Sequence, residues 1–275
     1  MTSDVSTLGI IAGGGELPLE VARAAAAAGR DVFIMAVSEF AEDIPAPFVH
    51  ERNSIAKFGR SIAALRRHGC KDVVFVGHFA RPRDKNLKIR PDLQALWFLF
   101  SNFGVLRRSN DGIHRAFAAT FERRGFRVQS PLQVVPSLAA KQGYLTDMHA
   151  TPDVEAGFAD ALAAARIHGN TGQGQAIVVR GGQTIAAETR SGTDAMLKAL
   201  EISEALGAVL AKSMAPDQLP TMDPPAIGVQ TIELAAAAGL AGVIVEAGKS
   251  VIVQPDRVKA AADKAGIFVF GASSQ

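Results

Sequence analysis

The chain has 275 residues, of which 48% are hydrophobic and 20% are charged. That balance is typical of a globular enzyme rather than of a disordered or fibrous chain, and the length is near the size at which a second domain usually begins. Lys and Arg total 29 against 27 Asp and Glu, so the net charge of +2 provides no broad basic field to attract nucleic acid. We therefore expect two domains and no nucleic-acid partner.

Cys70 is the single cysteine, so the chain cannot close an internal disulfide or build a cysteine-type zinc site. Such a composition fits a reducing cytosol. The N-terminus lacks the basic segment and the long apolar segment of a signal peptide. The most apolar run, at 93–100, is far shorter than the roughly 20 residues of a spanning helix. We expect a cytoplasmic protein without a membrane span.

The first half alternates short buried strands with helices. Residues 7–12 form an apolar run that ends in three glycines, and the helix after them has Pro18 in its first turn and ends at Gly29. Apolar spacing also predicts strands at 31–37 and 71–77 and helices at 55–69, 92–106 and 111–125. This β-α-β-α-β order predicts a Rossmann-like parallel sheet over residues 1–130, with ligands at the carboxyl ends of its strands.

Residues 131–152 carry three prolines and no sustained period, so we predict a linker there. Residues 153–275 then form a second α/β domain. It opens with a helix that ends near Gly169 and continues with a β-hairpin turned at Gly181 and Gly182, a helix at 191–207 and a strand at 208–213. Further segments between 229 and 271 complete it. The predicted fold class is α/β with two domains and the ligand between them.

The turn after the first strand predicts a phosphate site at Ala12, Gly13, Gly14 and Gly15. Glycines have no Cβ, so backbone amides can approach an anion at the N-terminus of the next helix. The turn is not a full dinucleotide fingerprint, because Pro18 stands at the third glycine position, and it lacks the Gly-Lys-Ser/Thr of a P-loop. The alternative is a tight strand-to-helix turn without a ligand.

A second set of candidates follows the strand at 71–77, where the sequence is GHFARPR. The planar guanidinium of Arg81 is suited to clamp a pyrophosphate, and we favour it over Arg83, which we assign to a solvated loop. His78 is either a base or a helix-cap or packing residue.

Two aspartates stand at predicted helix starts. Asp111, in SNDGIH, caps the following helix or has a catalytic or metal role. Asp194, in SGTDAM, lies in a first turn that Ser191 or Thr193 can cap, where the helix dipole alone would favour a carboxylate.

The loop at 212–228 follows a buried strand and carries Lys212, Asp217, Gln218 and Asp223. Loops in that position often hold chemistry. Mg²⁺ keeps several waters, so one or two carboxylates and the phosphates of a substrate can hold it. The alternative is that Asp223 only starts a turn before Pro224.

The predicted helix at 92–106 contains LQALWFLF and is too apolar for an ordinary surface helix. We expect it in the core. The alternative is that it lines an acyl pocket or rests on a membrane surface, as amphipathic interfacial helices do.

Six segments, taken in order, resemble the UDP-2,3-diacylglucosamine pyrophosphatases of lipid A synthesis, of the type distinct from the metallophosphoesterase form. They are LGIIAGGGELP, VGHFARPR, GQAIVVRGGQTIAAETRSGTDAML, AKSMAPDQ, DPPAIG and AGLAGVIVEAG. The resemblance implies a two-domain cytosolic enzyme whose nucleotide-fold domain and second α/β domain clamp the substrate. It also implies Mg²⁺-dependent attack of water on the β-phosphorus, which releases UMP and 2,3-diacylglucosamine 1-phosphate.

The same resemblance implies roles for individual residues. Asp223, in DPPAIG, would be the metal ligand or base, and Asp111 and Asp194 would rank next among catalytic residues. Contacts to UMP, pyrophosphate or the rest of the substrate would come from Gly13, Gly14, Gly15, Gly77, Arg81, Tyr144, Thr193 and Lys212. One position departs from the expected pattern, because Leu219 rather than a second aspartate follows Gln218. Asp217 is therefore given no metal role.

Two other classes of function stay open on the residues alone. A nicotinamide-dependent oxidoreductase would need Glu39 or Asp43 as the ribose-binding acid. A non-catalytic module that binds a nucleotide sugar or lipid would use Asp223 and Asp111 only as turns and caps. A lipid-linked nucleotide-sugar substrate further implies peripheral contact with the inner membrane, and a homodimer is compatible with the sequence.

Overall fold

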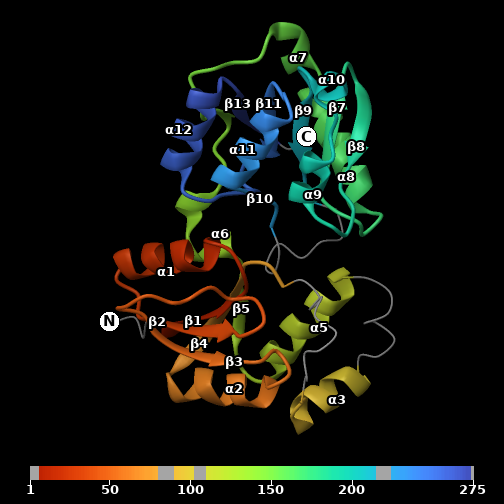
Figure 1. Ribbon diagram of the computed structural model, residues 1–275. Coiled ribbons are helices and arrows are strands. Elements are labelled where there is room, and N and C mark those ends of the chain that lie inside the picture. Colours follow the sequence, from red (N-terminus) through yellow and green to blue (C-terminus); the bar gives the residue numbers. More distant parts are fainter. Residues whose placement is uncertain (1–5, 80–89, 102–109, 215–223, 274–275) are drawn as a thin grey trace. The chain divides into compact units, whose positions relative to one another are not determined.

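The computed structural model describes residues 6–79, 90–101, 110–214 and 224–273. The described chain separates into two units, one up to Pro136 and one from Ser137 onward (Figure 1). The division falls inside the segment predicted as a linker, 131–152. Each unit is described by itself below.

The N-terminal unit is built on a sheet of five parallel strands in the order β3-β2-β1-β4-β5. The strands are β1 Thr7–Ala12, β2 Val32–Val37, β3 Val49–Asn53, β4 Cys70–Val76 and β5 Arg127–Gln129. This is the strand order of a Rossmann-type sheet. The order in which successive strands are added reverses between β1 and β4, and sheets of this type bind ligands at that point. The predicted Rossmann-like parallel sheet is confirmed.

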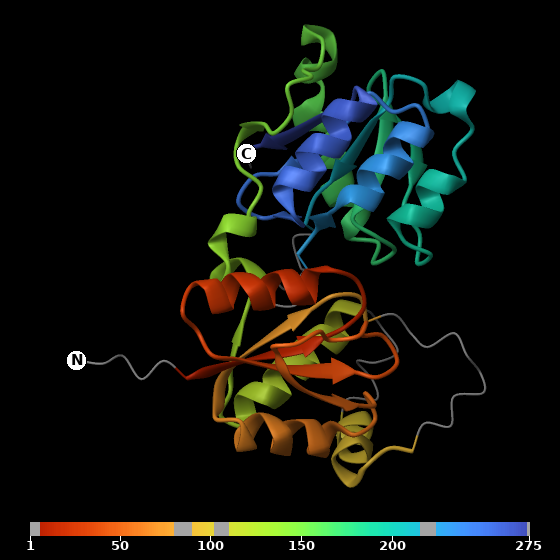
Figure 2. The ribbon, with the colours of Figure 1, turned by 60° about the vertical axis from the view of Figure 1, so that its left-hand side comes forward.

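Helices cover both faces of this sheet, because its strands are apolar on both sides. They are α1 Leu17–Ala27, α2 Phe58–Arg67 and α5 Asn110–Arg123, while α3 Leu93–Ser101 packs against α2. Figure 2 shows α1 on one face and α2 on the other. Along β1, Ile10 and Ile11 point to opposite faces, and both are buried.

Two strands of this sheet are absent from the sequence prediction. The segment VHERN of β3 is polar and largely exposed, so it has no buried apolar run to reveal it. At three residues, β5 is too short to show a period. Both lie at sheet edges, where one side of the strand has no neighbour to bury it.

The predicted linker contains short elements. Ser130 and Gln133 form a capping box that starts α6, Pro131–Val134. A 3₁₀ turn at Pro136–Leu138 follows, and β6, Gly143–Tyr144, then joins the sheet of the second unit.

The C-terminal unit has a mixed six-stranded sheet in the order β6-β13-β11-β9-β7-β8. The central strands β9, β11 and β13 are parallel, whereas β6 and β7 run antiparallel to their neighbours β13 and β9. The bounds are β7 Ala176–Arg180, β8 Gln183–Ala187, β9 Val209–Lys212, β11 Gly242–Glu246 and β13 Phe268–Ala272, with β10 Ala226–Ile227 and β12 Val251–Ile252 forming a separate pair. The predicted second α/β domain and its hairpin at Gly181 and Gly182 are confirmed.

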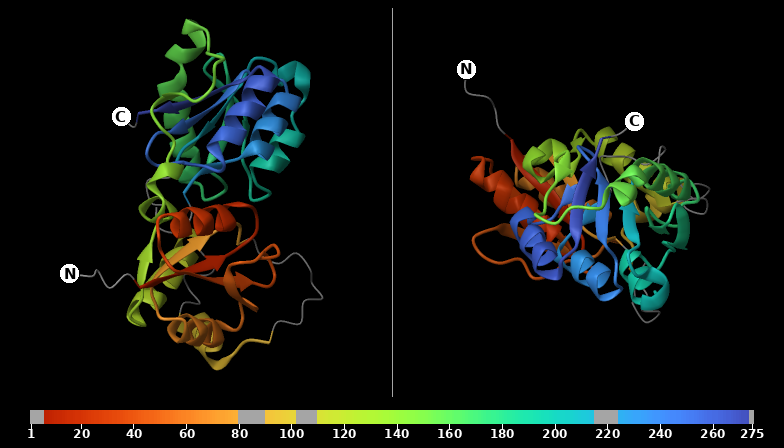
Figure 3. Two further views of the ribbon diagram at one scale, coloured as in Figure 1. Left: turned by 90° about the vertical axis from the view of Figure 1, so that its left-hand side faces the viewer. Right: turned by 90° about the horizontal axis from the view of Figure 1, so that it is seen from above.

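Two layers of helices enclose this sheet, and Figure 3 shows α11 and α12 side by side. Residue by residue, β11 alternates between the two cores, since Val243 and Val245 pack with α11 and α12 while Ile244 packs with α8. The helices are α7 Pro152–Ala156, α8 Phe158–Gly169, α9 Thr193–Lys198, α10 Ile202–Ala205, α11 Val229–Ala237 and α12 Pro255–Ala265.

Two predicted helices of the second unit are each divided. The first breaks at Gly157 into α7 and α8, and the helix predicted at 191–207 breaks after Lys198 into α9 and α10. Glycine, which is a poor helix former, explains the first break. Within the described residues, no helix has the length and apolar character needed to cross a bilayer.

Candidate functional site

The glycine turn after β1 meets the segment after β4 at the switch point of the N-terminal sheet. Gly14 and His78 form a two-way backbone bridge, in which the Gly14 N–H donates to the His78 carbonyl over 3.0 Å and the His78 N–H donates back over 2.9 Å. The Gly13 N–H donates to the carbonyl of Val76 over 2.8 Å. Residues predicted to bind phosphate are therefore brought together with Gly77.

The glycines allow this close approach. A Cβ on Gly13 would lie 2.5 Å from the His78 carbonyl oxygen, and one on Gly77, which has a φ of +97°, would lie 2.5 Å from the Gly14 carbonyl oxygen. The amides of Gly13 and Gly14 are already used inside the fold. A phosphate at this turn would thus depend on the Gly15 end, where α1 begins after Glu16 without a side-chain cap. Ala12 is fully buried.

Glu39, the first candidate for a ribose-binding acid, is engaged inside the N-terminal unit. One carboxylate oxygen accepts a hydrogen bond from the Ser54 hydroxyl, and the other accepts the Ile55 N–H over 3.0 Å. Asp43, the other candidate, is exposed and lies 3.5 Å from Arg52. Both carboxylate oxygens of Glu39 thus accept hydrogen bonds from residues that directly follow β3. This disfavours the alternative in which Glu39 binds the ribose of a dinucleotide.

A buried ammonium lies at the carboxyl end of β9 in the second unit. Lys212 is 8% exposed, and its Nζ donates to the Thr193 hydroxyl over 3.1 Å and to the Ala226 carbonyl over 3.0 Å. Within the described residues no carboxylate forms an ion pair with it. An ammonium carries three donors, so one remains for a further acceptor. Thr193 and Lys212, each predicted to contact the substrate, are therefore brought together.

Two glutamates at the same edge of the sheet were missed by the sequence analysis. Glu188 follows β8 and accepts hydrogen bonds from the Thr193 hydroxyl over 3.0 Å and from the Gln175 N–H over 2.7 Å. Glu246 ends β11, is fully buried and pairs with Arg166. A charged residue that ends an apolar strand, as in VIVE, is the signal that could have found Glu246.

The pKa of Glu246 is lowered in the folded protein. Burial by itself would raise that pKa, but hydrogen bonds from the Met214 N–H and from Arg166, together with the charge of Lys249, outweigh it. The carboxylate is therefore held ionised beside the chain that leads into the loop after β9.

Asp194 lies in the first turn of α9, next to Thr193, as predicted. The N-cap is Gly192, which has no side chain to cap the helix, and the Thr193 hydroxyl is used by Glu188 instead of capping. The position beside the Lys212 hydrogen-bond network is compatible with a catalytic role, which stays a prediction.

Tyr144 is not part of that network. It lies on β6, three strands from β9, or about 14 Å across the sheet. Its hydroxyl donates to Glu155 over 2.7 Å and accepts the Ala150 N–H over 3.2 Å. Burial and the hydrogen bond to Glu155 raise its pKa, so the phenol is neutral and tied to α7.

The remaining predicted residues cannot be placed. Arg81 and Asp223 lie outside the described residues, and Asp111 is described only as a backbone position within α5. In the described part of the chain, no group of three or more His, Cys, Asp or Glu could hold a metal ion. Glu188 and Glu246 already accept protein donors, so they do not supply an open carboxylate for Mg²⁺.

These features define a class: an α/β protein with a Rossmann-type sheet, a glycine turn at its switch point, and a second mixed-sheet unit with a buried lysine at its strand ends. Comparison with known proteins identifies the family. Residues 7–138 match the LpxI N-terminal domain and residues 141–270 match the LpxI C-terminal domain.

The chain is 37% identical over 276 aligned positions to the UDP-2,3-diacylglucosamine pyrophosphatase LpxI of Caulobacter vibrioides, and the alignment covers 98% of each protein. This chain belongs to the LpxI family, which confirms the resemblance drawn from its six segments.

Proposed function

We propose that the protein hydrolyses UDP-2,3-diacylglucosamine to UMP and 2,3-diacylglucosamine 1-phosphate in lipid A synthesis. The observation that carries this proposal is the identity of 37% along 98% of the chain to a pyrophosphatase of that name. Both family domains match this chain, over residues 7–138 and 141–270.

The reaction forms one bond to phosphorus and breaks another. Water attacks the β-phosphorus, the bond from that phosphorus to the bridging oxygen breaks, and UMP leaves with the bridging oxygen. Negative charge grows on the leaving phosphate, and a preorganised donor in a buried site stabilises it best. Lys212 fits this role, because it is buried and, among the described residues, its ammonium donates only to two neutral oxygens, those of the Thr193 hydroxyl and the Ala226 carbonyl.

We further propose that the reaction depends on Mg²⁺, with Asp223 as the metal ligand or base and Asp111 and Asp194 as the next candidates. When bound, Mg²⁺ would neutralise the pyrophosphate and lower the pKa of the attacking water. One or two protein carboxylates suffice for this ion, so a cluster of three is not required.

The decisive experiment incubates the purified protein with UDP-2,3-diacylglucosamine and Mg²⁺ in ¹⁸O-water, with and without a chelator, and follows the products by mass spectrometry. We expect chelator-sensitive release of UMP, with the label in the sugar phosphate. Label in UMP would instead place the attack on the α-phosphorus. No turnover with any divalent metal would overturn the proposal and favour the binding module.

The Asp223→Ala variant tests the assigned carboxylate. We expect turnover to be abolished while substrate binding persists, since the change removes a metal ligand or base rather than the binding surface. Asp217→Ala is a matched control from the same loop and should retain activity. Equal activity in the two variants would remove Asp223 from the mechanism.

We also propose peripheral contact with the cytoplasmic face of the inner membrane through α3. For the described part of the predicted helix, Leu93–Ser101, the expectation of a core position is wrong at most residues, since Ala95 and Phe98 are the buried ones. Leu93, Trp97 and Phe100 are 84%, 54% and 87% exposed, and exposed Arg90 precedes them. An apolar helix face beside a cation is typical of interfacial helices.

Flotation with vesicles that contain anionic lipid measures this contact. Leu93→Ser combined with Phe100→Ser should reduce the bound fraction severalfold, because the two largest exposed apolar groups of α3 are lost. Ile167→Ser combined with Ile202→Ser removes side chains that are 69% and 58% exposed in the other unit and should leave flotation unchanged. Identical flotation of both double variants would contradict the assignment to α3.

A further inference from the structure

Three polar side chains form a continuous hydrogen-bonded path from the end of β8 to the buried ammonium at the end of β9. The Glu188 carboxylate accepts the Thr193 hydroxyl over 3.0 Å, and the Thr193 oxygen accepts a hydrogen bond from Lys212 Nζ over 3.1 Å. Thr193 and Lys212 are both buried, whereas Glu188 is partly exposed. The function proposed above uses Lys212 and leaves Glu188 without a role.

Glu188 sets the direction in which the Thr193 hydroxyl points its single proton. A hydroxyl has one donor and two acceptor sites, an ionised carboxylate only accepts, and an ammonium only donates. Thr193 therefore gives its proton to Glu188 and turns a lone pair toward Lys212. The Ala226 carbonyl accepts a second N–H of Lys212 over 3.0 Å. With two of its three donors fixed in this way, the tetrahedral ammonium has one direction left for the third N–H.

The Glu188 side chain is itself held in place by groups other than Thr193. Its second carboxylate oxygen accepts the Gln175 N–H over 2.7 Å, and its backbone carbonyl accepts a hydrogen bond from His168 Nε2 over 2.7 Å. The side chain lies directly over Gly174, where an added Cβ would come within 2.4 Å of the Glu188 Cγ. The carboxylate thus keeps one position from which to orient the hydroxyl.

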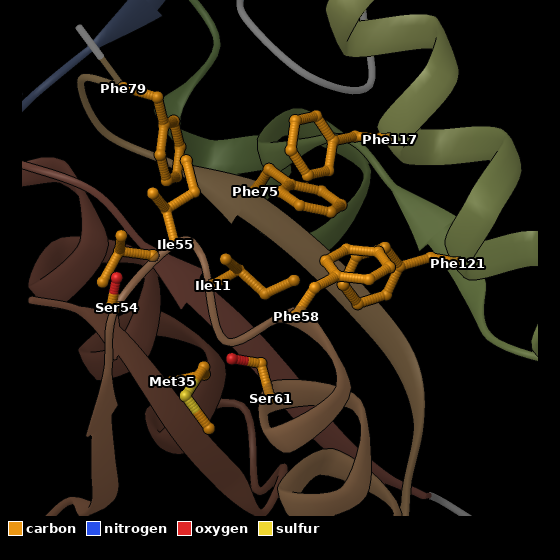
Figure 4. A pocket seen from close by; sticks show the side chains of 11 residues that line it. Ile11, Met35, Ser54, Ile55, Phe58, Ser61, Phe75, Phe79, Phe117 and Phe121 are labelled. Atoms are coloured by element: carbon orange, nitrogen blue, oxygen red, sulfur yellow. The ribbon is translucent and has the colours of Figure 1, made fainter. Parts of the chain in front are cut away.

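The N-terminal unit contains a carboxylate and a hydroxyl in a similar arrangement that leads to no cation. Glu39 accepts the Ser54 hydroxyl and, over 3.0 Å, the Ile55 N–H. The Ser54 oxygen accepts the Ala56 N–H over 3.2 Å, and Figure 4 shows Ser54 among the side chains that line an apolar pocket. Within the described residues no lysine or arginine donates to Ser54. That pair closes a turn, whereas the pair in the C-terminal unit ends on an ammonium with a donor to spare.

We propose that Glu188 is a positioning residue for Lys212, which acts through the Thr193 hydroxyl to direct the third N–H of the ammonium at the phosphate of the substrate. The proposal rests on the function proposed above, since that function gives Lys212 its charged acceptor. A preorganised donor stabilises developing charge because it needs no reorientation during the reaction. Glu188 therefore affects kcat more than KM.

Glu188→Gln keeps the shape of the side chain and reverses the polarity of the path. The Gln175 N–H is a fixed backbone donor, so the new amide oxygen faces it and the new NH₂ faces Thr193. The Thr193 proton then points at Lys212, donor against donor. We expect kcat to fall about 10- to 100-fold, less than for complete loss of a donor, with KM within about twofold of the wild type. Glu201→Gln, at an exposed position of the same unit, should match the wild type.

Two changes at Thr193 test whether the effect passes through the hydroxyl. Thr193→Ser keeps the hydroxyl and should keep kcat within about threefold of the wild type. Thr193→Val removes it, and adding Glu188→Gln to Thr193→Val should lower kcat no further, because the path to Lys212 is already broken. Independent losses that multiply in the double variant would overturn the proposal. A wild-type kcat in Glu188→Gln would overturn it as well.

A binding measurement separates this proposal from the hydrolase. UMP carries the full charge of the leaving phosphate, which the substrate does not, so calorimetric titration with UMP in the absence of metal reports whether Lys212 still points at it. We expect Glu188→Gln to weaken UMP binding about tenfold, close to the value of one hydrogen bond to a charged group, and Glu201→Gln to leave it unchanged. That result without any turnover would retain the positioning role and reject the hydrolase. Equal UMP affinity in the wild type and Glu188→Gln, in an active enzyme, would reject the positioning role alone.

Discussion

The two sheets bury charge at opposite ends. In the N-terminal unit, Asp72 is 4% exposed and lies near the amino end of β4, where it accepts hydrogen bonds from Arg30 and Arg127. In the C-terminal unit, Lys212 and Glu246 are the last residues of β9 and β11. Parallel α/β sheets bind ligands at the carboxyl ends of their strands. The buried charge at the amino end of the first sheet therefore contributes to stability, whereas those of the second sheet lie at the edge where a role in the reaction is proposed for Lys212.

The carboxyl ends of the two sheets also differ in what they present. In the first, the described residues offer glycine backbone and an apolar pocket. In the second, they offer an ammonium and two carboxylates held by specific donors. The two carboxyl edges are therefore chemically different, the first apolar and the second charged.

The largest effect should come from Lys212→Met. Removing the buried ammonium should lower kcat/KM by about 10²–10³-fold, the usual cost of losing a preorganised donor to developing charge. The free energy of unfolding should change little, because Met has a similar shape and no buried charge. Steady-state kinetics with urea unfolding of the same preparation measures both quantities.

Lys198→Met is the matched control for Lys212→Met. Lys198 ends α9 and is exposed, so its loss should leave both turnover and stability near wild-type values. Similar turnover in the two lysine variants would mean that the buried ammonium of Lys212 only packs the end of its strand. The buried charges of both units would then be structural.

Glu246→Gln should have the next largest effect, on stability. The change removes the anion that pairs with Arg166, and breaking a buried pair costs about 3 kcal/mol. Because the pKa of Glu246 is lowered in the folded state, its stabilisation is present in full above the unfolded value and disappears as pH falls through the folded value. Urea unfolding between pH 7 and pH 3 should show wild type and variant converging at the acid end.

A constant difference between wild type and Glu246→Gln across that pH range would show that shape, rather than charge, makes the contribution. A loss of turnover in folded Glu246→Gln would add Glu246 to the reacting groups beside Lys212.

Apolar runs predicted the centre of each sheet closely. The strands expected at 7–12, 31–37 and 71–77 correspond to β1, β2 and β4 within one residue at each end, because buried parallel strands are apolar throughout. Edge strands lack that signal, which is why β3 was missed. The exposure of Trp97 and Phe100 was also missed, since a local apolar pattern does not show whether a neighbour covers it.

The sequence predicted the glycine turn as a local motif, and the family resemblance implied Thr193 and Lys212 as substrate contacts. The structure brings Thr193 and Lys212 into hydrogen-bond contact, but their roles stay predictions. Glu246 was missed, because its partner Arg166 is 80 positions away and only the folded sheet brings the two together. The aspartates ranked highest, Asp223 above all, remain predictions.

The smallest effect should come from Asp72→Asn, and it should fall on stability alone. Arg30 is 19% exposed and Arg127 is 73% exposed, so solvent screens part of the interaction and we expect a loss of about 2 kcal/mol, below the usual cost of breaking a buried pair. Turnover per folded molecule should equal that of the wild type, because the amino end of β4 is the end away from the ligand edge. Asp31→Asn, at an exposed neighbouring position, should change neither quantity. A fall in the kcat of folded Asp72→Asn would contradict this comparison of the two units, because the buried charge of the N-terminal unit would then also affect the reaction.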